Sequence, residues 1–336
     1  MSKRTGKPIR RESQTEAFKD ALRYMKEFMD GNVQTLKTPW PKFDDALLDG
    51  IEWQTLIVVG ARPGTGKTLF VEQIVREAFR LNPGLTFRVL KFQFEMVGKT
   101  SSIREFSGVV NKSYKELCNK NLDPVIWDKC FQHAAQVTQF PINVVYEQCT
   151  VTDFIATVED EMEKFCYYEK DKDGNTVKKY TRMLITIDHS YLFKKDSFEK
   201  DKHEMLNNLG EALTDLKRRY PIAFILLSQL NRNIDNPERN EDGKYGNYIL
   251  ESDLFGADAL LQHADTVVGI NKPAKQKIRY YGPDRYIIED ENTLAFHFLK
   301  CRNGDTRLSF FKAEFHNMRI VEMQTPATQD RKLSTK

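Results

Sequence analysis

The chain has 336 residues, of which 40% are hydrophobic, with 51 Lys and Arg against 48 Asp and Glu. It is long enough to bury a sizeable core, and a net charge of +3 is too small to mark the whole chain as a nucleic-acid binder. The five cysteines form no C-x-x-C pair and no apolar run approaches a membrane span, so we expect a soluble protein of the reducing cytoplasm without zinc or disulfides.

The chain begins with a basic stretch, residues 1–12, which we expect to be disordered. A linker helix is predicted within residues 13–32, because Ser13 and Glu16 have capping-box spacing. Apolar residues recur on one face of this helix, and that face must pack against something. The main domain is expected at 33–322, followed by a tail at 323–336.

From residue 55 the pattern indicates an α/β fold: a mostly parallel twisted sheet flanked by helices. Strands are predicted at 55–61, 87–94, 142–146, 183–188, 223–229, 266–270 and 294–300, and helices after the first strand and at 151–166 and 202–219. Two segments interrupt this order. Residues 167–180, with Asp-Gly at the centre, predict a charged hairpin, and residues 231–253 are polar and long enough for a functional loop.

The stretch "GARPGTGKT", residues 60–68, lies between a predicted strand and a predicted helix. It fits the phosphate-loop pattern G-x-x-x-x-G-K-[ST] except that Ala61 replaces the first glycine. Lys67 is expected to neutralise the β and γ phosphates, and Thr68 to bind Mg²⁺. The predicted nucleotide-binding residues are Ala61, Arg62, Pro63, Gly64, Thr65, Gly66, Lys67 and Thr68.

Three polar residues follow apolar strands of the same predicted sheet. Asp188 ends its strand, where a carboxylate can hold the Mg²⁺ through water. Glu95 could polarise the water that attacks the γ phosphate. Gln229 could sense the γ phosphate and pass its presence to the loop that follows.

In this order the motifs resemble the C-terminal motor domain of the DnaB-type replicative helicases, a branch of the RecA-like ATPases. That family typically has Ala at the first glycine of the loop, as Ala61 is here. "FQFEM" resembles its "FSLEM" motif, which implies that Glu95 is the catalytic base. "LITIDHSYLF" resembles the stretch that carries the metal-associated acid, Asp188, and "LSQLNR", with Gln229, matches as it stands. His189 departs from the family pattern beside that acid.

"LKCRNGDTRLSF" resembles "GKQRNGPIGTVRLTF", in which Lys and Arg reach across a subunit boundary to the γ phosphate of the neighbour. These roles fall on Lys300 and Arg302. The resemblance covers the main domain, and the hairpin at 167–180 departs from it. The family's N-terminal collar domain is expected to be missing, and the helix at 13–32 matches the linker that docks on the adjacent motor domain. Folding back of this helix on its own domain remains the alternative.

The resemblance implies an ATP- and Mg²⁺-dependent motor that forms a homo-hexameric ring, translocates on single-stranded DNA and unwinds forked duplex in the 5′ to 3′ direction. A primase or a helicase loader would be its protein partner, and a phage origin would place it in the host cytoplasm. The loops after the Asp188 and Gln229 strands would hold the DNA through Lys194, Lys195, Arg232, Arg239 and Lys244. Two other interpretations stay open: a RecA-like strand-pairing ATPase that does not unwind, and a ring ATPase that does not bind DNA.

Overall fold

The computed structural model describes residues 13–170, 174–240, 248–254 and 257–328. The chain divides into two compact units, residues 1–35 and residues 36–336, and each is described by itself. The expected basic tail at 1–12 and the last part of the expected C-terminal tail, 329–336, lie outside the described residues.

In residues 13–35, the described part of the first unit, there is one helix, α1 (Gln14–Met29). Its capping box is confirmed: the Ser13 side chain accepts a hydrogen bond from the Glu16 backbone, and the Glu16 side chain accepts one from the backbone of Ser13. No side chain of α1 is buried, and its apolar side chains are exposed, among them Phe18, Leu22 and Met25 at 61%, 65% and 59%. The helix therefore presents an uncovered apolar stripe.

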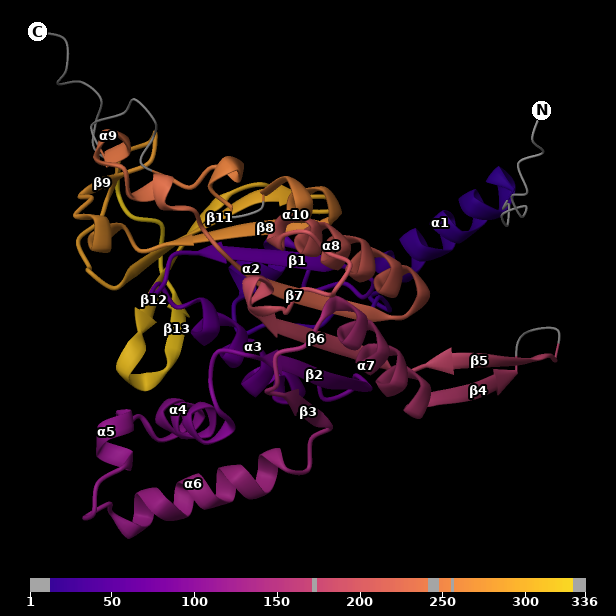
Figure 1. The fold of residues 1–336 in the computed structure, drawn as a ribbon, viewed down its shortest axis with the longest axis horizontal. Helices are drawn as coiled ribbons and strands as arrows, with labels where there is room; N and C mark the ends of the chain where they lie inside the picture. Colours follow the sequence, from indigo (N-terminus) through magenta and orange to yellow (C-terminus); the bar gives the residue numbers. More distant parts are fainter. Residues whose placement is uncertain (1–12, 171–173, 241–247, 255–256, 329–336) are drawn as a thin grey trace, which may run out of the picture. The chain divides into compact units, whose positions relative to one another are not determined.

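The second unit is organised around one sheet, which has nine strands among the described residues, in the order β13-β12-β11-β8-β1-β7-β6-β2-β3 (Figure 1). The six strands from β8 to β3 pair in parallel, whereas β11, β12 and β13 are antiparallel. The strands are β1 (Leu56–Ala61), β2 (Phe87–Gln93), β3 (Ile142–Val145), β6 (Arg182–Asp188), β7 (Ile222–Gln229), β8 (Thr266–Asn271), β11 (Thr293–Cys301), β12 (Leu308–Glu314) and β13 (Arg319–Glu322). The predicted mostly parallel sheet is confirmed.

The helices of the second unit match the predicted ones where the sequence shows strong periodicity. The helix predicted at 202–219 is present with those bounds, and the one predicted at 151–166 ends two residues earlier. The α-helices of this unit are α2 (Pro41–Ala46), α3 (Lys67–Leu81), α4 (Gly98–Val110), α5 (Tyr114–Leu117), α6 (Pro124–Val137), α7 (Val151–Lys164), α8 (Lys202–Arg219), α9 (Pro237–Asn240) and α10 (Ala257–His263). Among the described residues, no helix is long and apolar enough to cross a lipid bilayer.

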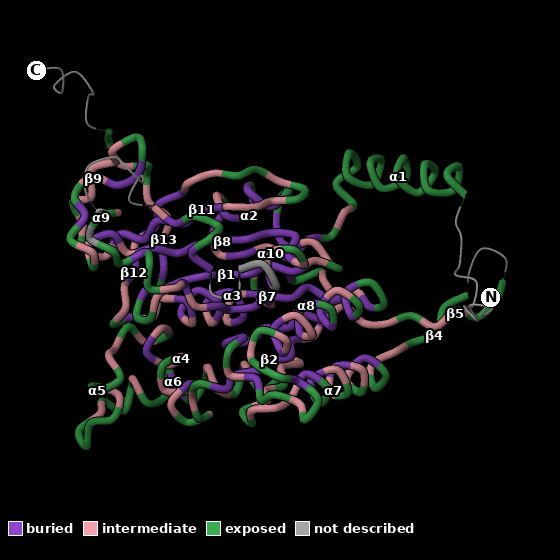
Figure 2. The backbone as a smooth tube through the Cα atoms, turned by 45° about the horizontal axis from the view of Figure 1, so that its top comes forward, coloured by how far each residue is buried: buried purple, intermediate pink, exposed green. Residues whose placement is uncertain are grey.

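Both faces of the sheet are buried, as an all-apolar strand requires. In β1, Leu56 and Val58 belong to one core with α7, α8 and α10, whereas Ile57 and Val59 belong to a second core with α2 and α3. This alternation follows from the two-residue period of a strand. Figure 2 shows the buried strands running through the interior, between these two sets of helices. The sheet edge that carries the phosphate loop is thus held from both sides.

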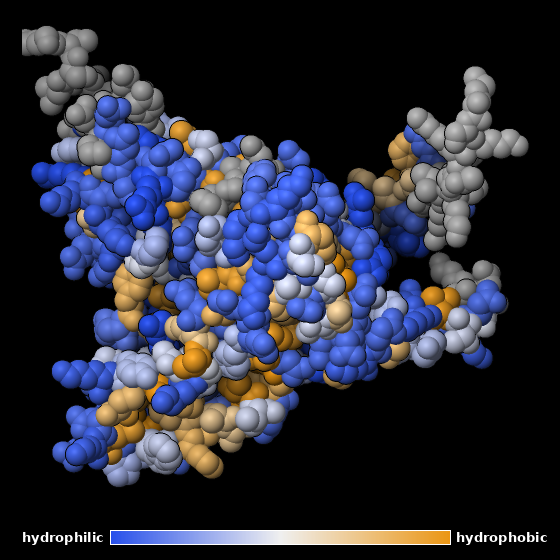
Figure 3. Space-filling model, in the orientation of Figure 1, coloured by the Kyte–Doolittle hydropathy of each residue, from blue (hydrophilic) through white to orange (hydrophobic). Residues whose placement is uncertain are grey.

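Several elements were not predicted from the sequence, among them helices α4 to α6 and the strands β12 and β13. Helices α4 to α6 stand where no helix was predicted, and α6 leaves Val125, Trp127 and Phe131 exposed at 61%, 64% and 64%. Figure 3 shows hydrophobic atoms on this part of the surface. The predicted hairpin is confirmed as the antiparallel pair β4 (Cys166–Lys170) and β5 (Thr176–Tyr180), with residues 171–173 of its turn not described.

A third, smaller core contains a buried histidine beside the short strands β9 (Tyr280–Tyr281) and β10 (Tyr286–Ile287). The Tyr281 hydroxyl and Nε2 of His297 share a hydrogen bond of 2.6 Å, and the Tyr248 ring stacks on the imidazole with 5.7 Å between ring centroids. Burial lowers the pKa of His297 to about 3. The ring is therefore neutral in the folded chain.

This histidine predicts an acid-sensitive fold. The pKa of His297 in the folded chain, about 3, lies below the unfolded value of 6.5, so the unfolded chain binds the extra proton between these pH values. The free energy of unfolding should fall as the pH drops below 6.5, by up to about 1.4 kcal/mol per pH unit from this group. Urea titrations at several pH values between 5 and 7 give the free energy of unfolding as a function of pH. For His297→Gln we expect this free energy to change less with pH than in the wild type, by a slope that corresponds to up to about one bound proton. Equal slopes would contradict this assignment.

Candidate nucleotide-binding and catalytic site

The phosphate loop leaves the sheet at the carboxyl edge of its central parallel strands. β1 ends at Ala61, paired on either side with β7 and β8, and α3 begins at Lys67. Gly64 and Gly66 have φ values of +73° and +98°, in the left-handed region that favours glycine. Ligands of open parallel sheets bind at this edge, outside the carboxyl ends of the strands. The local conformation is thus the one a phosphate-binding loop needs.

Contacts from two other segments hold the loop in place. The Arg62 guanidinium pairs with Asp235 at 2.8 Å and donates to the Leu230 carbonyl, both in the segment after β7. The Lys275 ammonium donates to the Pro63 carbonyl at 2.5 Å. The Thr65 hydroxyl donates to the Arg62 carbonyl at 2.7 Å. The loop is therefore tied to the segment that follows Gln229.

Thr68 and Asp188 meet although 120 positions separate them. The Thr68 hydroxyl donates a 2.7 Å hydrogen bond to Oδ2 of Asp188, the last residue of β6. Burial raises the pKa of Asp188 to about 6, against the opposing effects of the Thr68 hydrogen bond and of Lys67. Among the described residues, no hydrogen-bond partner reaches its buried Oδ1. A carboxylate oxygen and a hydroxyl oxygen side by side are ligands that Mg²⁺ prefers.

Three further predicted residues lie around this pair. Lys67 is buried, and burial lowers its pKa against the opposing charges of Asp188 and Glu95. Glu95 is exposed, two residues beyond the end of β2, which stops one residue earlier than predicted. Gln229 ends β7, and its amide nitrogen lies 3.4 Å from Nε2 of His189. Burial lowers the pKa of His189 to about 4, so its neutral ring can accept that hydrogen bond.

A cavity of about 420 Å³ opens over these groups. It is lined by the phosphate loop, Glu95 and Gln229, and also by residues that the sequence did not single out: Arg104, Ser107, Ser113, Tyr114, Phe315, His316 and Met318. Phe315, His316 and Met318 follow β12, which was not predicted, and the other four lie on or beside α4 and α5. Most of these residues are aromatic or polar, but their positions in the sequence do not indicate that they lie near Lys67.

Lys300 and Arg302 do not line this cavity and lie toward the other end of the sheet. β11 is antiparallel to β8, so that Lys300 pairs with Val267 near the start of β8, whereas Ile270 near its end pairs with Ala61. Three residues of strand separate Val267 from Ile270, or about 10 Å. The structure therefore brings Lys67, Thr68, Glu95, Asp188 and Gln229 together, but not Lys300 and Arg302.

The predicted DNA-binding residues differ in how free their side chains are. Lys194, Lys195 and Arg232 are exposed, and the Lys195 ammonium donates to the Lys200 carbonyl at 2.9 Å. Arg239 has a side chain that is only 12% exposed, and it pairs with Asp253 and donates to the Tyr248 carbonyl. Lys244 lies outside the described residues. In this conformation Arg239 holds its own loop together.

These features define the class of protein. A lysine and a threonine at the start of a helix, facing an acid at the end of a parallel strand, are the groups of a P-loop nucleoside-triphosphate-binding domain. The family model of the DnaB-like helicase C-terminal domain matches residues 35–319, so the chain belongs to that family.

Relatives and solved structures agree with this family. The replicative DNA helicase DnaB of Helicobacter pylori is 25% identical over 227 residues, which cover 67% of this chain and 41% of that protein. A solved DnaB-like replicative helicase, described with its interactions with primase, has a TM-score of 0.73 at 17% identity and covers 95% of this chain and 69% of that one. A solved ATPase domain has a TM-score of 0.74 at 17% identity, covering 94% of this chain and all of that one. The chain spans about half the length of the curated relatives it matches.

Proposed function

We propose that this chain is the ATP-driven motor of a replicative DNA helicase, acting as a hexameric ring that moves along single-stranded DNA in the 5′ to 3′ direction and unwinds duplex. The observation that carries the proposal is the convergence of Lys67, Thr68, Glu95 and Gln229 on one cavity at the carboxyl edge of the sheet, with Asp188 hydrogen-bonded to Thr68 beside it. Family membership supplies the substrate class. A primase or a loader is proposed as a partner on the same basis.

The side chains around the cavity suit phosphoryl transfer to water. Lys67 places its ammonium at the phosphates, and the N-terminus of α3 adds its positive dipole end. Glu95, exposed to the cavity, orients the attacking water and accepts its proton. Thr68 and Asp188 would hold Mg²⁺, which supplies positive charge opposite the phosphate oxygens when bound. The unpartnered Oδ1 of Asp188 fits that role.

Lys300 and Arg302 complete the site only from a second subunit. The register of β8 and β11 places them toward the end of the sheet opposite the phosphate loop of the same chain, which supports a role in a neighbouring site. Arginine supplied by a neighbour stabilises the charge of the transition state in many P-loop enzymes. A ring in which each subunit lends these two residues to the next therefore accounts for both their chemistry and their place.

DNA contact is proposed for the loops after β6 and β7. Lys194, Lys195 and Arg232 are exposed there, and cationic side chains that follow a phosphate backbone bind in a salt-dependent, sequence-tolerant manner. The ion pair between Arg62 and Asp235 joins the second of these loops to the phosphate loop. A conformational change at the phosphate loop can therefore be transmitted through this ion pair to the loop that is proposed to contact DNA.

A forked duplex with a single-stranded tail tests the function. With ATP and Mg²⁺ we expect strand displacement on a fork with a 5′ tail and none on a fork with only a 3′ tail. Displacement by the reverse tail alone would overturn the direction. Binding and ATP turnover without displacement would favour the strand-pairing interpretation, and turnover unaffected by single-stranded DNA would favour a ring ATPase that does not act on DNA.

The linker helix α1 is proposed to dock on the adjacent subunit and hold the ring together. Deletion of residues 1–32, or Leu22→Asp on the apolar stripe, should shift the hexamer to smaller species in sedimentation velocity with ATP and Mg²⁺, because the stripe is then lost or charged. Arg23→Ala, on the polar face beside Asp20, is the matched control and should leave the hexamer intact. A stable hexamer without residues 1–32 would instead favour packing of the helix on its own domain.

A further inference from the structure

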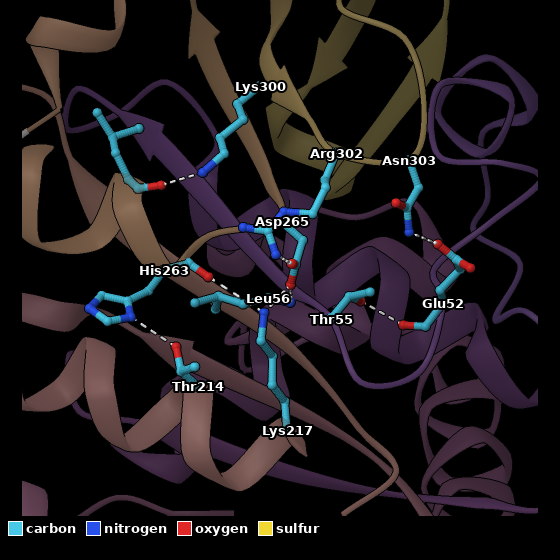
Figure 4. A network of polar contacts seen from close by, with 11 residues as sticks. Glu52, Thr55, Leu56, Thr214, Lys217, His263, Asp265, Lys300, Arg302 and Asn303 are labelled. Atoms are coloured by element: carbon cyan, nitrogen blue, oxygen red, sulfur yellow. Dashed lines mark hydrogen bonds and ion pairs between the residues drawn. The ribbon is translucent and has the colours of Figure 1, made fainter. Parts of the chain in front are cut away.

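One carboxylate, Asp265, binds two cations beside the end of β11. Its Oδ1 accepts a 2.9 Å contact from Nη1 of Arg302, and its Oδ2 pairs with the ammonium of Lys217 on α8 (Figure 4). The backbone N–H of Leu56 donates to the same Oδ2 at 2.8 Å. The backbone N–H of Arg302 donates to the carbonyl of Asp265 at 2.9 Å, so the two residues are also joined through the main chain.

The three side chains differ in exposure. Those of Lys217 and Asp265 are 8% and 11% exposed, whereas that of Arg302 is 57% exposed. A carboxylate held by a buried ammonium and a backbone N–H is fixed in place. A guanidinium that reaches it from solvent forms a weak pair, which a stronger anion can displace. The Lys300 ammonium donates to the Leu261 carbonyl at 2.6 Å and adds a third cation to the group.

We infer that Asp265 is a positioning residue that holds Arg302 in the unengaged subunit and releases it when a phosphate oxygen of the neighbour's nucleotide takes its place. The inference rests on the proposed role of Arg302 in the adjacent site. Lys217 weakens the contact between Asp265 and Arg302, because its ammonium binds the same carboxylate. With Lys217 present, the negative charge of Asp265 is shared, and the hold on Arg302 is weaker than that of a free carboxylate.

Two variants should shift ATP hydrolysis in opposite directions. Lys217→Met leaves the carboxylate to Arg302 and the Leu56 N–H, so kcat for ATP hydrolysis should fall several-fold with little change in ATP affinity. Lys217→Met combined with Asp265→Asn removes both buried charges at similar volume and frees Arg302, so kcat should rise above that of the wild type. The double variant avoids leaving Lys217 buried without a carboxylate, which would destabilise the fold. Melting curves of both variants establish that they are folded.

If Asp265, Lys217 and Arg302 only stabilise the fold, both variants should lose activity, and that result would overturn the inference. Asp45→Asn is the matched control: Asp45 pairs at 2.8 Å with Arg307, which lies on the same connection between β11 and β12. It should leave kcat unchanged. In an Arg302→Ala background, neither variant should change kcat, because no guanidinium is left to hold.

The same measurements distinguish two claims: the role of Arg302 in the neighbouring site, and the holding of Arg302 by Asp265. If Arg302→Ala alone leaves hydrolysis at the wild-type rate, the role of Arg302 in the neighbouring site is wrong. If Arg302→Ala lowers hydrolysis but the two Lys217 variants do not shift kcat in opposite directions, that role stands and the holding by Asp265 is wrong.

Discussion

Lys67→Ala should abolish ATP hydrolysis, with a fall in rate of at least about 10³-fold. The ammonium of Lys67 is buried at the start of α3 and faces the carboxylates of Asp188 and Glu95. Without it, those two negative charges face the phosphates with no cation of the same chain between them. Phosphate release measured at saturating ATP and single-stranded DNA gives the rate, and a fluorescent nucleotide reports the accompanying loss of affinity.

A lysine outside the cavity provides the control for this experiment. Lys312 on β12 is 41% exposed and pairs with Asp290 at 2.5 Å. Lys312→Ala removes the same charge from the chain, and its rate should stay at the wild-type value. If Lys67→Ala turned over ATP at a comparable rate, the loop at residues 60–68 would not be the catalytic phosphate site.

Arg302→Ala should separate nucleotide binding from hydrolysis. Since the phosphate loop of the same chain lies at the other end of the sheet, the affinity for ATP should stay nearly unchanged. The rate of hydrolysis in the assembled protein should fall on the order of 10³-fold, because the charge that stabilises the transition state is missing from the neighbour's site. Equilibrium binding of a fluorescent ATP analogue and steady-state turnover measure the two quantities.

The same hairpin offers the control. Arg307 pairs with Asp45 rather than with Asp265, so Arg307→Ala should affect neither quantity strongly. Full hydrolysis by Arg302→Ala would refute the role in the adjacent site. A loss of binding as large as the loss of rate would place Arg302 in its own nucleotide site, in conflict with the register of β8 and β11.

The sequence predicted the sheet well because its central strands are short, continuous apolar runs. The phosphate loop was equally visible, since Gly64, Gly66 and Lys67 are fixed by backbone conformation and charge. Helices α4 to α6 were missed, because few of their side chains are buried and their apolar residues do not all face a core. The helical spacing of apolar residues indicates a buried helix face, and a half-exposed helix shows this spacing only weakly.

The residues proposed to act in catalysis could be picked out from the sequence, whereas the residues around them could not. Thr68 and Asp188 could be paired because each ends or follows a strand of the same sheet. Phe315 reaches the cavity through a turn after a strand that the sequence did not reveal. The ion pairs of Asp265 could not be predicted from the sequence either. Arg302 and Lys217 lie 37 and 48 positions from Asp265 in the chain, and no spacing rule relates residues at those separations.

The uncovered helix α1 has a thermodynamic consequence. A segment of 16 residues with no buried side chain keeps its helical state by its capping box and by local pairs such as Arg23 with Asp20, and isolated helices of about this length are marginal in water. If α1 docks on the adjacent subunit as proposed, its folding and that association are a single coupled event. Part of the free energy gained when the stripe is covered would then be consumed in ordering the helix, so that subunits would bind more weakly, and exchange more readily, than the contact area alone would give.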